Sequence, residues 1–97
     1  MPEARLLGVD REPGSLYEAL LELDYEGRSY RLRIGRLLRP PAHVAEVRLH
    51  GEYLTIELRD EHGAPVATCC IHRGHLERGC MECPSLVAPP HGYGEKT

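Results

Sequence analysis

The sequence predicts an all-β domain, an antiparallel meander of about six short strands that forms a small sandwich or a partial barrel and ends in a C-terminal metal-binding loop. Three observations predict this fold. Apolar and charged residues alternate with a period of two on both sides of glycine turns. Clusters rich in Gly and Pro separate the alternating segments. All four cysteines lie within the fifteen residues 69–83.

The clearest hairpin covers residues 21–34, "LELDYEGRSYRLRI". Its leucines fall on one face and its charged residues on the other, as expected for a sheet with one buried side. A two-residue loop at Gly27 and Arg28 would form a type II′ turn. This register would place Asp24 opposite Arg31, so that unlike charges pair across the strands.

The other strands follow from the same alternation. We expect a short strand at residues 6–9, a second hairpin at residues 45–58 around Gly51, and a further strand, "VATCCIH", at residues 66–72. The stretch "RPPA", residues 39–42, interrupts the pattern, because proline cannot donate a hydrogen bond to a strand ladder. Residues 15–20 are ambiguous. Ser15 and Glu18 form a capping box typical of a helix start, whereas the hairpin pattern favours a strand from about Leu20 onward.

Length and composition limit the functional classes. A chain of 97 residues has room for one domain. We assign residues 1–83 to a single β domain that includes the metal-binding loop 69–83, and residues 84–97 to a tail rich in Pro and Gly. The net charge of −3 argues against nucleic-acid binding. No apolar run suits a signal peptide or a membrane span, so we expect a soluble cytoplasmic protein.

Strand alternation divides the cysteine cluster between two faces. Cys69 is expected to face the core, whereas Cys70 and His72 share the opposite face. Cys80 and Cys83 form a C-x2-C pair that can direct two sulfurs at one ion. In a reducing compartment, three thiolates and one imidazole are the ligand set of a closed structural zinc site. Zinc is therefore the expected cofactor, bound by these four residues.

Other ligand assignments remain open. Cys69 and His72 form a C-x2-H pair with Gly74 two residues beyond. This arrangement resembles the knuckles of zinc ribbons, in which a glycine follows the second ligand. His75, on the loop that must turn back, is a third candidate. The polar loop from Arg73 to Gly79 has one sizeable apolar residue, so we expect it to need the metal for its shape.

The segment "CIHRGHLERG", residues 70–79, also resembles the first ligand box of Rieske-type iron–sulfur proteins, and "CP" at Cys83 is similar to the start of their second box. The resemblance implies a [2Fe–2S] cluster, with Cys70 and Cys83 on one iron and His72 on the other. Leu86 occupies the position of the second histidine, and His91 is the nearest later histidine. An electron-transfer domain is therefore the alternative function.

Together these observations predict a small cytoplasmic accessory or protein-interaction module whose C-terminal loop is held by a structural zinc ion. Four protein ligands leave no coordination position for a substrate, so an enzyme is the less favoured class. The expected partner is another protein, with neither nucleic acid nor membrane as a target.

Overall fold

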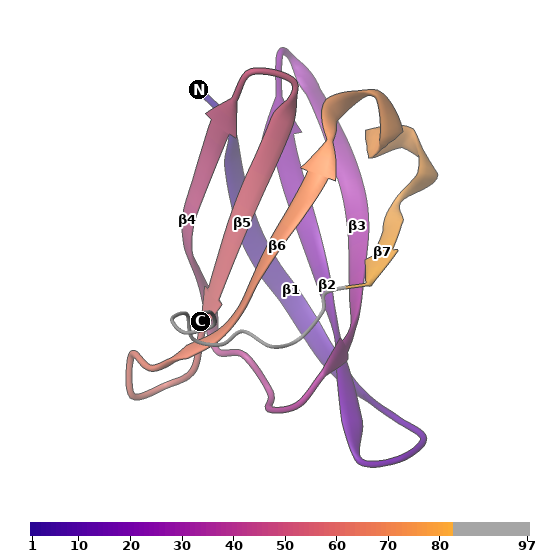
Figure 1. The fold of residues 1–97 in the computed structure, drawn as a ribbon, viewed down its shortest axis with the longest axis vertical. Helices are drawn as coiled ribbons and strands as arrows, with labels where there is room; N and C mark the ends of the chain where they lie inside the picture. Colours follow the sequence, from indigo (N-terminus) through magenta and orange to yellow (C-terminus); the bar gives the residue numbers. More distant parts are fainter. Residues whose placement is uncertain (83–97) are drawn as a thin grey trace, which may run out of the picture.

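A computed structural model describes residues 1–82 of the chain, and of residues 80–82 the backbone alone. The chain forms two β-sheets that face each other (Figure 1). No helix among the described residues is long and apolar enough to cross a membrane. In chain order the elements are β1 (Glu3–Glu12), β2 (Leu16–Tyr25), β3 (Arg28–Leu37), β4 (His43–His50), β5 (Tyr53–Arg59), β6 (Pro65–His72), the 3-10 helix η1 (Arg73–Arg78) and β7 (Cys80–Glu82).

The expected meander of six antiparallel strands is confirmed. One sheet has the order β1-β2-β3-β7 and the other the order β4-β5-β6. The break at residues 39–42 lies where the chain passes from the first sheet to the second. The short strand β7 was not expected. It pairs in parallel with β3, so the chain returns to the first sheet after β6 and η1 (Figure 1).

The core lies between the two sheets and is aliphatic. Alternate residues of β2, β3, β5 and β6 point into it, as the period of two requires. Burying a leucine or isoleucine side chain contributes about 1.5–3 kcal/mol, so these residues supply most of the stabilisation. Fully buried members are Leu21, Leu23, Leu32, Ile34, Leu37, Leu54, Ile56 and Leu58.

The predicted register of the first hairpin is wrong: the observed pairing is shifted by two residues. Tyr25 pairs with Arg28, so the loop residues are Glu26 and Gly27, with φ angles of 52° and 78°. Two positive φ angles are those of a type I′ turn, whose twist suits a two-residue hairpin. Glu22 therefore faces Arg31. The face assignment holds, because a shift of two positions leaves every side chain on its side of the sheet.

Residues 15–20 contain no helix. Ser15 lies in the turn with φ 65°, and β2 begins at Leu16, earlier than the expected Leu20. The capping box is overridden because β2 pairs along its length with β1, which is itself longer than the expected 6–9. An irregularity between Leu6 and Gly8 interrupts this pairing.

Candidate metal-binding site at the end of β6

The strand phase on which the ligand assignment depends is as expected. Cys69 is 1% exposed and belongs to the core cluster, together with Ala67 and Ile71. Cys70 is exposed and is a free thiol. Because β6 is a regular strand up to His72, the side chains of Cys70 and His72 lie on the same, outward face of the second sheet.

His72 connects β6 to the helix that follows. Its Nδ1 accepts a hydrogen bond of 3.0 Å from the backbone N–H of Gly74, which caps η1. Its ring also packs edge-on against Tyr53, with ring centroids 5.1 Å apart, and lies 5.3 Å from the ring of His75. The outward end of β6 therefore carries the ring of His72 in contact with one phenol and one further imidazole.

The contact with Gly74 affects how His72 could bind a metal. An Nδ1 that accepts a hydrogen bond carries no proton, so the proton of the neutral ring is on Nε2. Ligation through Nε2 would move that proton to Nδ1, where it would oppose the N–H of Gly74. Zinc binding by His72 thus requires this capping hydrogen bond to break, and the loop after His72 has to adjust.

The loop between the expected ligand pairs is held by protein contacts of its own. Leu76 is 3% exposed and closes one end of the core. The guanidinium of Arg73 donates a 3.2 Å hydrogen bond to the Tyr25 hydroxyl and lies 3.2 Å from a carboxylate oxygen of Glu52. The phenol of Tyr25, together with nearby carboxylates, raises the pKa of Arg73. The burial of Leu76 and the contacts of Arg73 therefore attach this polar loop to the rest of the domain.

The residue after η1 fastens the returning chain to the first sheet. Gly79 has φ 70°, and its carbonyl accepts a 2.9 Å hydrogen bond from the backbone N–H of Arg33. A Cβ atom at Gly79 would lie 2.9 Å from the carbonyl oxygen of Arg31, so the approach requires glycine. Cys80 follows at once and pairs with Arg33 across β3 and β7. Its backbone therefore belongs to the sheet opposite that of Cys70.

The buried cysteine is not a free thiol. Cys69 is disulfide-bonded, and its partner sulfur lies outside the described side chains. Cys83 and His91, two of the other ligand candidates, also lie outside the described residues. Within the described part of the chain, no three His, Cys, Asp or Glu side chains are grouped as metal ligands would be. The described ligand candidates that share one surface are thus Cys70, His72 and His75.

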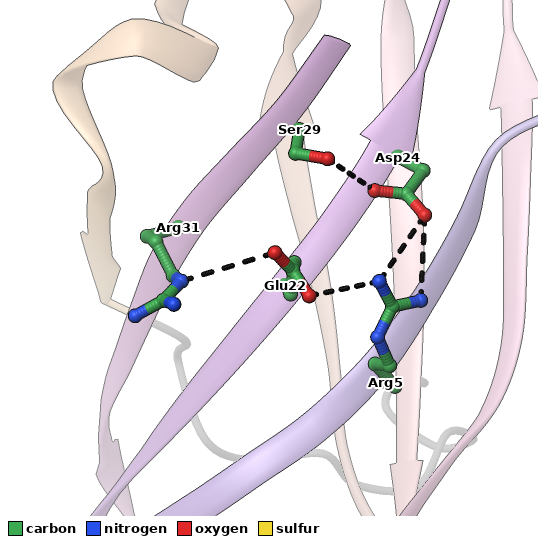
Figure 2. Close-up of polar contacts among 5 residues, drawn as sticks. All are labelled: Arg5, Glu22, Asp24, Ser29 and Arg31. Atoms are coloured by element: carbon green, nitrogen blue, oxygen red, sulfur yellow. Dashed lines mark hydrogen bonds and ion pairs between the residues drawn. The ribbon is translucent and has the colours of Figure 1, made fainter. Parts of the chain in front are cut away.

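The outward face of the first sheet carries charge pairs, but the predicted pair of Asp24 and Arg31 is not formed, because Asp24 lies opposite Ser29. Glu22 lies between two guanidinium groups, 2.8 Å from Arg5 and 4.0 Å from Arg31 (Figure 2). Asp24 accepts a 2.7 Å hydrogen bond from the Ser29 hydroxyl, which, with Arg5, lowers the pKa of the Asp24 carboxyl. These pairs are largely exposed, so solvent screens them and each contributes little to stability.

Two contributors to the site could not be assigned from the sequence. Tyr53 contacts His72 because the register of β5 and β6 places them opposite each other. Arg73 reaches Tyr25, which is 48 residues away. Strand pairing could have indicated the first contact, once the turn between β5 and β6 was assigned. No local pattern indicates the second.

No family model, curated protein or solved structure matches the chain in the three comparisons with known proteins.

Proposed function

We propose that this protein is a small cytoplasmic accessory module that binds another protein, and that a zinc ion bound by Cys70, His72, Cys80 and Cys83 closes its C-terminal region. The observation that carries the proposal is the placement of Cys70. A small β protein ordinarily has no structural reason to put a cysteine on a solvent-facing strand position, since free cysteine is among the most buried residue types. Here the exposed thiol lies one strand repeat from an imidazole.

The chemistry of these residues suits zinc. Thiolate and imidazole are the ligands found in structural zinc sites, and a C-x2-C pair supplies two thiolates from one short segment. Such a closed set leaves zinc without an open position, and its contribution is then to stability and shape. The interaction role rests on the same region, where the rings of Tyr53, His72 and His75 form an exposed aromatic surface.

The proposed site requires reduced protein. The chain has four cysteines, and Cys70 is free while Cys69 is disulfide-bonded. With Cys69 oxidised, a second cysteine is oxidised as well, so the three thiolates of the proposed zinc site are not all present. Zinc and this disulfide exclude each other, so stoichiometric zinc is expected when the protein is purified with a reductant and not after oxidation.

The test is elemental analysis of the full chain purified under reducing conditions, with Cys70→Ser and Cys69→Ser as a matched pair. We expect about one zinc per chain in the parent protein. Cys70→Ser should lose the metal, whereas Cys69→Ser should retain it and lose only core packing. Zinc lost from Cys69→Ser and kept in Cys70→Ser would show that the ion is bound from the inward face, through the Cys69 and His72 pair.

The same sample separates the alternative function. A red-brown protein containing iron and sulfide, with Cys70 and His72 needed for the colour, would replace zinc by a [2Fe–2S] cluster and the interaction role by electron transfer. A colourless protein without metal in any redox state would refute both assignments and leave the cysteines with a disulfide role.

A further inference from the structure

The free edges of the two sheets differ in how well they are protected against pairing with another strand. Strand edges of soluble proteins are usually blocked by charged residues, by bulges or by shortness. Strand β1 carries five charged residues and an irregularity, β4 carries Glu46 and Arg48, and β7 has three residues. Strand β6 is an edge strand of eight residues, and it contains no Asp, Glu, Lys or Arg. Its edge is the unprotected one among the described strands.

Some backbone groups of β6 point toward this edge and not toward β5. The N–H of Arg73 donates a 2.8 Å hydrogen bond to the carbonyl of Glu52, which identifies these two residues as a hydrogen-bonded pair of the antiparallel ladder. Hydrogen-bonded pairs recur every second residue, so Ile71 and Cys69 also point their backbone groups toward β5. The N–H and C=O groups of the alternate residues, Thr68 and Cys70, therefore point away from β5.

The side chains beside this edge favour a close approach. Thr68 and Cys70 are exposed, small and uncharged. Tyr53, on the neighbouring strand, is 50% exposed and packs against His72. A strand laid along β6 would meet no charge on the four positions from Thr68 to Ile71, and it would meet an aromatic surface at the far end.

The two ends of β6 carry opposite exposed charges. The turn before β6 contains Glu61, whose side chain is 79% exposed. The helix after β6 contains Arg78, which is exposed and makes no ion pair with another described residue. Figure 1 shows this turn and η1 at opposite ends of β6. In an antiparallel pairing of two β6 strands, the acidic turn of each copy would lie at the basic end of the other.

We propose that the partner bound at this edge is a second copy of this chain, paired β6 to β6 in antiparallel fashion about a two-fold axis near Cys69. In this register Thr68 lies opposite Cys70 of the other copy, and the two three-stranded sheets join into one of six strands. Each contact occurs twice, as a two-fold interface requires. The inference deepens the proposed interaction role and rests on it, but it does not require the metal.

The experiment measures the molar mass of the full chain by light scattering and by sedimentation over a range of concentrations, with Thr68→Lys and Thr55→Lys as the variant and its control. Thr68 lies on the free edge, while Thr55 lies on the same outward face of the inner strand β5. We expect a dimer for the parent chain. Thr68→Lys places two like charges near the axis and should weaken the dimer by about tenfold or more, whereas Thr55→Lys should leave it intact.

A second measurement does not depend on the folding of a variant. With a chelator present, Cys70 is a free thiol, and diagonal neighbours across an antiparallel pair are about 7–8 Å apart. A short bismaleimide should therefore join two parent chains, and Cys70→Ser should abolish that product. A parent chain that stays monomeric, or a dimer that survives Thr68→Lys and does not cross-link through Cys70, overturns the inference. Because zinc is measured separately, a monomer with zinc would leave the metal site standing.

Discussion

Gly79 lies between η1 and β7 in a left-handed backbone conformation. It allows a test of how the C-terminal region is attached to the first sheet. Gly79 has φ 70°, and a Cβ atom there would lie 2.9 Å from the backbone carbonyl oxygen of Arg31. Gly51, in the turn between β4 and β5, has φ 60° with nothing within 4 Å of its Cβ position. Gly79→Ala and Gly51→Ala therefore share the conformational strain and differ in the steric contact.

The magnitudes follow from that difference. A non-glycine residue in the left-handed region costs about 1–2 kcal/mol, and this is the whole effect expected for Gly51→Ala. Gly79→Ala must in addition push the chain away from β3 and weaken the hydrogen bond from Arg33, which adds about 0.5–1.5 kcal/mol. The melting temperature of a domain of this size changes by roughly 4–8 °C per kcal/mol, so the two variants are distinguishable.

Urea unfolding of both variants gives the free energies of unfolding, and amide hydrogen exchange localises the change. We expect Gly79→Ala to be the less stable variant, with faster exchange at the amide of Arg33. Equal destabilisation of the two variants, with the amide of Arg33 still protected, would show that β7 is not fastened through Gly79.

Two further predictions concern the loop of residues 73–79 and the loss of stability at acid pH. Leu76→Ala should destabilise the protein by about 2–5 kcal/mol even with excess chelator. Leu49→Ala, at a 42% exposed site, should cost far less. Equal losses of unfolding free energy in urea would refute the core role of Leu76. Hydrogen bonds from the backbone of Ala64 and His62, and from Arg39, lower the pKa of Asp60 in the folded state. The stability from this shift is therefore present above the unfolded pKa of about 3.9 and is lost as the pH falls through the lower folded value. Asp60→Asn should flatten this decline below about pH 5, and parallel curves of unfolding free energy against pH would contradict the assignment.

The strands and their faces could be predicted because side-chain alternation is a local property. Leu21 and Leu23 face the core for the same reason that Cys69 does, and each assignment needs only neighbouring residues. The turn of the first hairpin was misassigned, because glycine is favoured at the first loop position of a type II′ turn and at the second loop position of a type I′ turn. The structure has the second of these turns, in which Glu26 adopts a positive φ angle.

What could not be predicted depends on contacts between distant residues. Strand β7 has three residues, too few for a period to be recognised, and it pairs in parallel with a strand some 47 positions earlier in the chain, as Cys80 opposite Arg33 shows. The burial of Leu76 and the reach of Arg73 to Tyr25 depend on the same return of the chain. The shared outward face of Cys70 and His72 was accessible to sequence analysis because it depends on strand phase alone.

The protein contacts that hold η1 in place change how much stability a bound zinc ion would contribute. In a zinc finger the metal supplies the order of the loop, so binding and folding occur together. Here Leu76 and Arg73 order the loop through protein contacts, and the Nδ1 atom of His72 is already used to cap it. Metal binding would thus exchange the hydrogen bond from Gly74 for a coordination bond in a loop that is already folded. Its net gain in stability should be smaller than in a zinc finger, and its larger effect should be on the outward surface around Tyr53, where His72 would have to shift.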